Sequence, residues 1–157
     1  MDLDFLKRLG RGTYTLVVYL SDDAAVAVGS LGHLFFERGL YSYTGSALGP
    51  SKFALYHRVR RHLGFDKRLH WHIDFLLNSD VSRVVAVCAA SSERFECKVA
   101  GELMHIEGVV FINGFGSSDC NCVSHLHYFG DVDLDFVLSV VSDVYRGLML
   151  KPYCFYV

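Results

Sequence analysis

Two runs of β-branched and aromatic residues constrain the fold of this chain more than any other feature. Residues 13–20 (TYTLVVYL) and residues 81–89 (VSRVVAVCA) have the composition of buried strands. Apolar residues recur at helical spacing over residues 51–64 and 93–105. The chain therefore combines a sheet with packed helices, and we expect an α+β or mixed α/β fold.

Shorter elements fill the intervals between these segments. The patterns predict a short N-terminal helix at 2–9, strands at 25–28, 34–36, 40–44 and 109–112, and helices at 70–78 and 134–150. We expect Gly64 to end the helix that begins at Ser51, and Ser91 or Ser92 to cap the helix that begins at Glu93. The segment 134–150 is predicted to dock on the domain or to form a dimer contact, so a monomer or a weak homodimer is expected.

The length of 157 residues fits one domain, and 52% hydrophobic residues indicate a generous core and argue against disorder. No apolar run reaches the roughly 18 residues that a membrane span requires. The first residues include Asp2 and Asp4 and lack a long apolar stretch, so no signal peptide is expected. We therefore expect a cytoplasmic protein.

Basic residues gather between positions 57 and 72, although the net charge of the whole chain is −2. Against the single acid Asp66, this segment contains Arg58, Arg60, Arg61, Lys67, Arg68, His57, His62, His70 and His72. Such clustering favours a local anion-binding face. A solvated helix face is the alternative interpretation.

Five motifs stand in a fixed order along the chain. Gly-Thr-Tyr at 12–14 opens one predicted strand, and Tyr-Thr-Gly at 43–45 closes another. The sequence RVRRH follows at 58–62, HWHID at 70–74, and Glu96 lies on a later predicted helix. Each motif is weak by itself, but the ordered set is specific.

This ordered set resembles the GIY-YIG nuclease superfamily, in which two tyrosine-bearing strands, a helix arginine and a later glutamate form the cutting site. The chain is more similar to an archaeal-type branch marked by YxGSA, RH, HWHID and GFGxSDCxC, which stand here at 43–47, 61–62, 70–74 and 114–122. The resemblance covers about residues 12–129. It implies a small, mainly antiparallel sheet with helices packed on it.

The chain departs from the family pattern in its two strand motifs. Thr13 and Thr44 stand where the family has isoleucine. The separation between Tyr14 and Tyr43 is longer than the usual short hairpin of the family. Residues 21–39 are therefore expected to form an extra β-hairpin.

The resemblance implies metal-dependent hydrolysis of DNA phosphodiester bonds, with Mg²⁺ or Mn²⁺ as the cofactor. Tyr14 or Tyr43 would activate or position the water, Arg58 would stabilise the transition state, and Glu96 would bind the metal. These residue types suit the chemistry, because a guanidinium matches a phosphate and a carboxylate supplies the hard oxygen that such ions prefer. Glu93 and Glu102 lie on the same predicted helix and are alternatives to Glu96.

Further polar residues are assigned to the same cleft by the resemblance. A proton relay or phosphate contacts are expected from His62, His70, His72 and Asp74. Contacts with DNA are expected from Ser46, Arg60, Arg61, Lys67 and Arg68.

The five cysteines are an odd number in a chain without a visible signal peptide, which favours free thiols or metal ligation over a full disulfide framework. Soft ligands lie close together at Cys120, Cys122 and His125, and Cys97 could join them. These four residues could form a structural Zn²⁺ site or contain one disulfide. Cys154 and the terminal PYCFYV segment are expected to pack against the domain.

We expect an N-terminal lead at 1–11, a nuclease-like domain at 12–129 and a C-terminal helical extension at 130–157. The first functional hypothesis is an endonuclease in DNA repair or processing. The alternatives are a non-catalytic nucleic-acid-binding module with the same fold, and a structural domain stabilised by zinc or a disulfide.

Overall fold

The computed structural model describes residues 2–65 and 68–157. Its centre is a six-stranded sheet in the order β6-β7-β4-β1-β5-β8, and every neighbouring pair is antiparallel. The strands are β1 (Gly12–Leu20), β4 (Gly39–Ala47), β5 (Ser82–Ser91), β6 (Val110–Phe111), β7 (Leu126–Gly130) and β8 (Tyr153–Tyr156). The expected antiparallel sheet within an α+β fold is confirmed.

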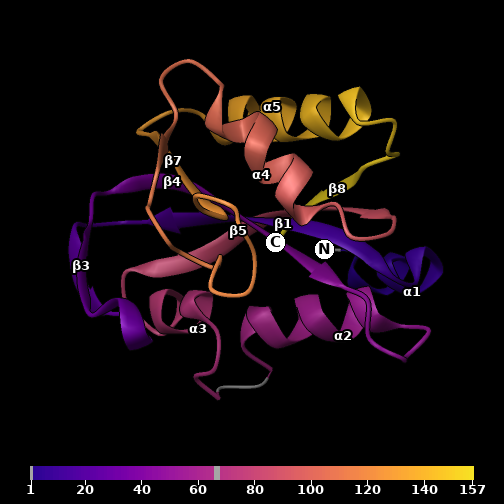
Figure 1. The fold of residues 1–157 in the computed structure, drawn as a ribbon, viewed down its shortest axis with the longest axis horizontal. Coiled ribbons are helices and arrows are strands. Elements are labelled where there is room, and N and C mark those ends of the chain that lie inside the picture. The colour runs from indigo at the N-terminus through magenta and orange to yellow at the C-terminus, as the bar shows by residue number, and fades with distance from the viewer. Residues whose placement is uncertain (1, 66–67) are drawn as a thin grey trace.

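Helices cover both faces of this sheet (Figure 1). One face carries α1 (Leu6–Leu9), α2 (Ala54–Arg60) and α3 (His72–Leu77), and the other carries α4 (Glu96–Met104) and α5 (Leu134–Gly147). A π-helical turn (Arg61–Phe65) extends α2, and short 3₁₀ turns lie at Leu3–Phe5 and Gly29–Leu31. Among the described residues, no helix has both the length and the apolar character needed to cross a membrane.

Strand β1 carries apolar side chains on both faces because helices cover both faces of the sheet at this strand. Leu16 and Val18 belong to the core under α2 and α3, whereas Val17 packs with Val137 and Val141 of α5. All five side chains are fully buried. Alternating side chains of a strand point to opposite faces, so a strand between two helical layers reads as a continuous hydrophobic run.

The extra hairpin expected at residues 21–39 is confirmed. It consists of β2 (Ala24–Ala27) and β3 (His33–Phe36), which pair only with each other among the described strands. Figure 1 places β3 at the edge of the molecule, away from the helical layers. The hairpin lengthens the connection between β1 and β4 without interrupting their pairing.

Two helix starts differ from the expectation. Helix α4 begins at Glu96 rather than Glu93, and no side chain caps it, because Ser91 still belongs to β5 and the Ser92 hydroxyl bonds to Thr13 Oγ1 at 2.8 Å. Helix α3 begins at His72 rather than at residue 70, because Trp71 is extended, with φ −89° and ψ 160°.

The C-terminal segment forms an additional edge strand. Strand β8 pairs with β5, and Cys154 forms a disulfide with its cross-strand partner Cys88. The sequence analysis expected only packing here and missed the strand. Helix α5 buries Val137, Val141 and Tyr145 against the sheet, so its apolar face serves the core of the same chain.

Candidate active site

A cavity of about 390 Å³ lies at the end of the sheet where β1 and β4 meet α2 and the start of α4. Tyr14, Tyr43, Arg58 and Glu96 all line it. The structure therefore brings together the four residues that the sequence analysis predicted on two strands and two helices.

The pairing of β1 with β4 places both tyrosines in this cavity. Tyr14 lies opposite Gly45, and Leu16 lies opposite Tyr43, so the two tyrosines share one face of neighbouring strands. Both belong to the core cluster on the α2 side. A Cβ atom at Gly45 would lie 2.5 Å from the Tyr14 hydroxyl oxygen, so only glycine leaves room for this ring.

The Tyr14 hydroxyl bonds to His62 Nε2 at 2.8 Å. Burial raises the pKa of Tyr14 to about 12 and lowers the pKa of His62 to about 3. Both groups are therefore neutral near pH 7, so the tyrosine donates and Nε2 accepts. In that tautomer the proton of His62 is on Nδ1, which lies 3.9 Å from Asp74 Oδ1 and has no hydrogen-bond partner among the described residues.

Asp74 is held firmly behind His62. Its two carboxylate oxygens accept from Arg61 Nη1 and Nη2, each at 2.8 Å. The backbone N–H groups of His70 and Trp71 donate to Oδ2 at 2.8 and 2.7 Å. Burial opposes the charged form, but these hydrogen bonds prevail and lower the pKa of the carboxyl.

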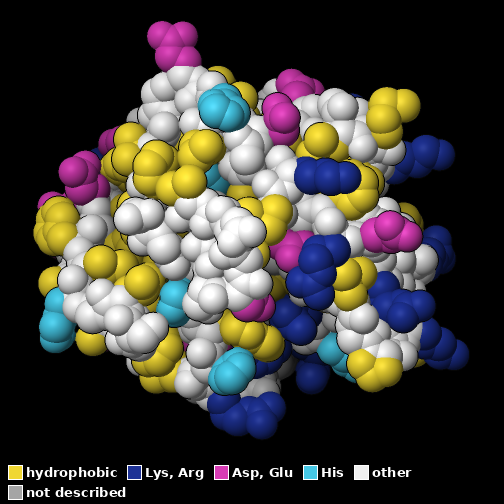
Figure 2. All heavy atoms as spheres, viewed as in Figure 1, with side chains coloured by type: hydrophobic (Ala, Val, Ile, Leu, Met, Phe, Trp, Pro, Cys, Tyr) yellow, Lys and Arg dark blue, Asp and Glu magenta, His cyan; other side chains and the backbone are white. Residues whose placement is uncertain are grey.

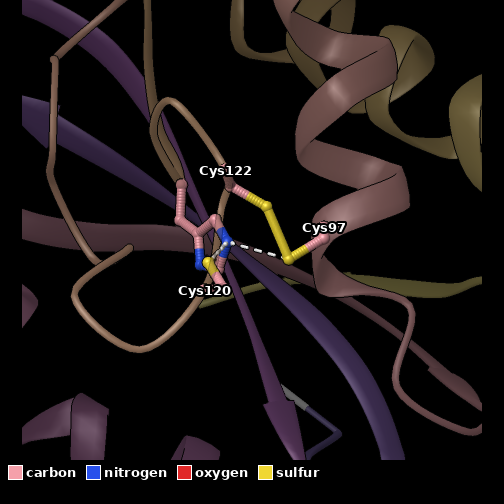
Figure 3. A group of neighbouring side chains, drawn as sticks. Cys97, Cys120 and Cys122 are labelled. Carbon is pink, nitrogen blue, oxygen red and sulfur yellow. Dashed lines mark hydrogen bonds between the residues drawn. A yellow bond between two sulfur atoms is a disulfide. The ribbon is translucent and has the colours of Figure 1, made fainter.

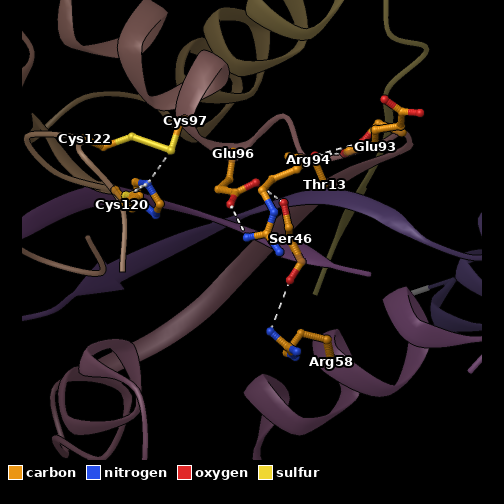
Figure 4. A network of polar contacts seen from close by, with 11 residues as sticks. Thr13, Ser46, Arg58, Glu93, Arg94, Glu96, Cys97, Cys120 and Cys122 are labelled. Carbon is orange, nitrogen blue, oxygen red and sulfur yellow. Dashed lines mark hydrogen bonds and ion pairs between the residues drawn. A yellow bond between two sulfur atoms is a disulfide. The ribbon is translucent and has the colours of Figure 1, made fainter. Parts of the chain in front are cut away.

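Arg58 and Glu96 reach the cavity from opposite layers, with Ser46 between them (Figure 4). Arg58 Nη1 donates to the Ser46 carbonyl at 3.2 Å, and its guanidinium lies 4.4 Å from the centre of the Trp71 ring. The Glu96 carboxylate accepts from the Ser46 hydroxyl and forms an ion pair with Arg94 at 3.2 Å. Helix α2 thus supplies a cation, and the first turn of α4 supplies an anion.

The structure separates Glu96 from its sequence alternatives. The Glu96 residue is only 6% exposed and lines the cavity, whereas Glu93 and Glu102 are exposed and do not line it. The start of α4 at Glu96, not at Glu93, decides which carboxylate faces inward.

A family model described as "Domain of unknown function DUF123" matches residues 13–148. The chain belongs to this family. Comparisons with curated proteins and with solved structures give no match. The matched region of the DUF123 domain runs from β1 to the end of α5 and includes every cavity residue named above.

Two histidines of the HWHID motif do not line the cavity of this DUF123 domain. His70 is exposed, and its backbone N–H rather than its ring contacts Asp74. The ring of His72 accepts from the Gly116 N–H through Nδ1 at 2.8 Å and so holds the loop at the cavity wall. Neither ring lines the cavity beside Tyr14, Tyr43, Arg58 and Glu96, because His70 precedes the extended Trp71 and His72 turns toward the loop at Gly116.

The residues expected to contact DNA lie in different surroundings. Ser46 lines the cavity, but Arg61 is engaged with Asp74. Arg60 and Arg68 are exposed outside the cavity, and Lys67 falls outside the described residues.

Two charged cavity residues were missed by the sequence analysis. Arg94 and Asp119 line the cavity, and the Arg94 side chain is 70% exposed. Asp119 stands inside the GFGSSDCNC motif, so the motif itself was the signal that could have pointed to it.

Basic side chains gather on one side of the surface. Figure 2 shows them on the right-hand side of the drawn face, over α1, α2 and the start of α4, whereas few lie over β3. The exposed basic residues of these elements and their flanking loops include Lys7, Arg8, Arg11, Lys52, Arg94 and Lys98.

A cluster of sulfur and imidazole ligands lies beside the cavity. Cys97 follows Glu96 in α4 and faces the loop that carries Cys120 and Cys122 (Figure 3). Cys97 and Cys122 form a disulfide, Cys120 is free, and His125 lines the cavity. The ligand atoms of Cys97, Cys120, Cys122 and His125 lie within 4.8 Å of one another, so the cluster could hold a metal ion. The Cys97–Cys122 disulfide agrees with the single disulfide that the sequence analysis allowed within this cluster, whereas the Cys88–Cys154 disulfide was not expected.

Proposed function

We propose that this DUF123 domain is a metal-dependent endonuclease of the GIY-YIG type that hydrolyses DNA phosphodiester bonds. The observation that carries the proposal is the shared cavity of Tyr14, Tyr43, Arg58 and Glu96. These residues come from four different elements, and simple strand or helix packing does not require them to meet around open space.

Tyr14 is the proposed proton acceptor for the attacking water. A neutral tyrosine with a pKa of about 12 is a weak base by itself, so it must pass its own proton on as it takes one from water. His62 Nε2 at 2.8 Å receives that proton. Asp74 then stabilises the resulting imidazolium, since its carboxylate lies 3.9 Å from Nδ1. Because burial lowers the pKa of His62 to about 3, the imidazolium depends on the Asp74 carboxylate for its stability, and the relay is worth at most about 10²–10⁴-fold in rate.

Arg58 is the proposed partner of the scissile phosphate. Its guanidinium is planar and permanently charged, and the Trp71 ring together with the Ser46 carbonyl fixes its orientation. Arg94 at the exposed rim supplies a second cation. Positive charge fixed in advance stabilises the negative charge that develops in the transition state.

Glu96 and Asp119 are the proposed ligands of Mg²⁺ or Mn²⁺. Both carboxylates line the cavity, and a set of hard oxygen donors fits these ions. When bound, the ion neutralises phosphate charge and assists the leaving oxygen. The exposed Arg94 can exchange the Glu96 carboxylate for a phosphate oxygen as substrate enters.

DNA is the proposed substrate, and repair or processing in the cytoplasm is the proposed setting. The basic side of the surface in Figure 2 supports contact with a polyanion, because lysine and arginine side chains gather around the elements that form the cavity. Because the net charge of the whole chain is −2, this contact depends on the local gathering of basic side chains and not on the total charge.

The second candidate is a nucleic-acid-binding module that does not cut. One observation favours it: the Glu96 carboxylate already accepts from Ser46 and pairs with Arg94. A carboxylate satisfied by protein groups has less need of a metal. This candidate predicts salt-dependent binding without turnover.

A nicking assay across Mg²⁺ and Mn²⁺ tests the proposal. Glu96→Gln should reduce cleavage at least 100-fold, because it removes the metal-binding charge while keeping the side-chain shape. Glu93→Gln is the matched control, since it changes an exposed carboxylate three residues away and should cut like the wild type. Tyr14→Phe should also reduce cleavage by about 10²–10⁴-fold.

The outcome that rejects the nuclease is clear. Folded protein supplied with either metal would cut neither duplex, branched nor single-stranded DNA. Retained binding that weakens with salt would then support the second candidate, and salt-independent binding would oppose both.

A further inference from the structure

We infer that Cys97, Cys120, Cys122 and His125 form a four-coordinate zinc site beside the cavity. Three segments of the chain supply the ligands. Cys97 lies in the first turn of α4, Cys120 and Cys122 lie in the loop before β7, and His125 directly precedes β7. Their four ligand atoms lie within 4.8 Å of one another. The inference does not depend on the proposed nuclease activity.

The separations between sulfur and nitrogen fit a tetrahedral ion. With Zn–S distances of about 2.3 Å and Zn–N distances of about 2.0–2.1 Å, the S···N edge of a tetrahedron is about 3.6 Å. Cys97 Sγ and Cys120 Sγ each lie 3.6 Å from His125 Nε2. The imidazole nitrogen is therefore equally distant from two sulfurs, as a shared ion requires.

The disulfide between Cys97 and Cys122 describes an alternative state of the same atoms. A sulfur in a disulfide carries no thiolate charge, so zinc and this disulfide exclude each other. The disulfide explains why two of the four ligands are adjacent, but it gives no reason for Cys120 and His125 to converge on the same point. One zinc ion accounts for all four.

The loop that carries Cys120 and Cys122 is folded so that it faces α4. Gly114 and Gly116 have φ values of 76° and 74°, in the left-handed region that glycine tolerates. The backbone N–H of His125 donates to the Phe115 carbonyl at 2.8 Å and closes the loop. These features reverse the direction of the chain, so that Cys120, Cys122 and His125 all lie on the side of the loop that faces α4.

The proposed zinc holds cavity residues in place and does not itself take part in a reaction. Four protein ligands complete the coordination of zinc, and a closed site of this kind is structural. Cys97 directly follows Glu96, and Cys120 directly follows Asp119. The ion therefore ties the two cavity carboxylates to one rigid centre, although Glu96 lies in α4 and Asp119 lies in the loop between β6 and β7.

Metal analysis of protein purified under reducing conditions tests the inference. The wild type should retain one zinc per chain, and Co²⁺ put in its place should show thiolate charge-transfer absorption and the visible bands of a tetrahedral ion. Cys120→Ser is the discriminating variant, because Cys120 takes no part in the disulfide. It should weaken Co²⁺ and Zn²⁺ binding by more than about 100-fold.

Cys154→Ser is the matched control, since it removes a sulfur from the β5–β8 disulfide, which contributes no atom to the ligand cluster, and should leave metal binding unchanged. Circular dichroism establishes that each variant is folded. His125→Asn should weaken binding as Cys120→Ser does, which guards against loss of the fold in a single variant.

Two results would overturn the inference. One is a reduced wild-type protein that takes up neither zinc nor cobalt, and the other is a folded Cys120→Ser variant with wild-type metal affinity. Neither measurement involves DNA cleavage, so the zinc site and the nuclease can each fail independently.

Discussion

Replacing His127 with leucine should make the stability of this protein less dependent on pH between 7 and 5. His127 lies in β7, is fully buried, and has no hydrogen-bond partner for either ring nitrogen among the described residues. Burial lowers the pKa of this histidine to about 4. The ring is therefore neutral in the folded protein across this pH range.

The sign follows from comparison with the unfolded chain, where a histidine has a pKa near 6.5. Below that pH the unfolded state binds a proton that the folded state does not bind. The free energy of unfolding is therefore highest above pH 6.5 and falls as the pH drops toward 4. Each pH unit is worth about 1.4 kcal/mol, so lowering the pH from 7 to 5 costs about 2 kcal/mol at this position. Any folded pKa well below 5 gives nearly the same figure.

Urea unfolding of the wild type and of His127→Leu at pH 7 and pH 5 measures this effect. The variant should lose about 2 kcal/mol less than the wild type between the two pH values. His62, whose pKa burial lowers to about 3, remains in both proteins and contributes the same dependence to each. His33→Leu is the control, because it removes an exposed histidine and should leave the wild-type dependence intact.

An equal pH dependence in the wild type and the His127→Leu variant would refute this reasoning. It would mean that the buried ring is protonated in the folded state or is exposed to solvent there. The stability of the variant at pH 7 gives a second check. It should equal or exceed that of the wild type, because a buried polar group without partners is exchanged for an apolar one.

Two further predictions concern the packing around the site. Gly45→Ala should destabilise the protein by about 1–3 kcal/mol, because its Cβ would lie 2.5 Å from the Tyr14 hydroxyl and force the ring away from His62. Gly49→Ala in the same cavity meets no atom within 4 Å and should match the wild type in urea unfolding; equal stability of both variants would show that Tyr14 is not held in place. Tyr145→Phe should cost about 1 kcal/mol, because the Tyr145 hydroxyl bonds at 2.9 Å to a buried threonine of β1, and an unchanged urea midpoint would argue against that bond.

The sequence by itself determined the elements with strong local patterns. The β-branched run of β1 and the helical spacing of α5 predicted these elements to within a few residues. The ordered motifs also selected Tyr14, Tyr43 and Arg58, because residue types and their order are properties of the chain alone. The extra hairpin followed from the spacing of the two tyrosines in the same way.

Only the tertiary structure decided which polar groups meet. The start of α4 selected Glu96 over Glu93 and Glu102, and this start depends on where β5 ends rather than on a local capping signal. The rings of His70 and His72 lie outside the cavity. Trp71 is extended, so α3 begins at His72 and not at residue 70. Local sequence carries little information about such boundaries, since packing against the rest of the chain fixes them.

The terminal strand and the ligand cluster depended most on contacts distant in sequence. Strand β8 is short and gains its hydrogen bonds only by pairing with β5, so its own composition was a weak signal. Cys97 and His125 lie 28 positions apart, and their meeting is set by α4 packing over the loop before β7. The sequence supplied the ligand types, and the fold brought them within reach of one ion.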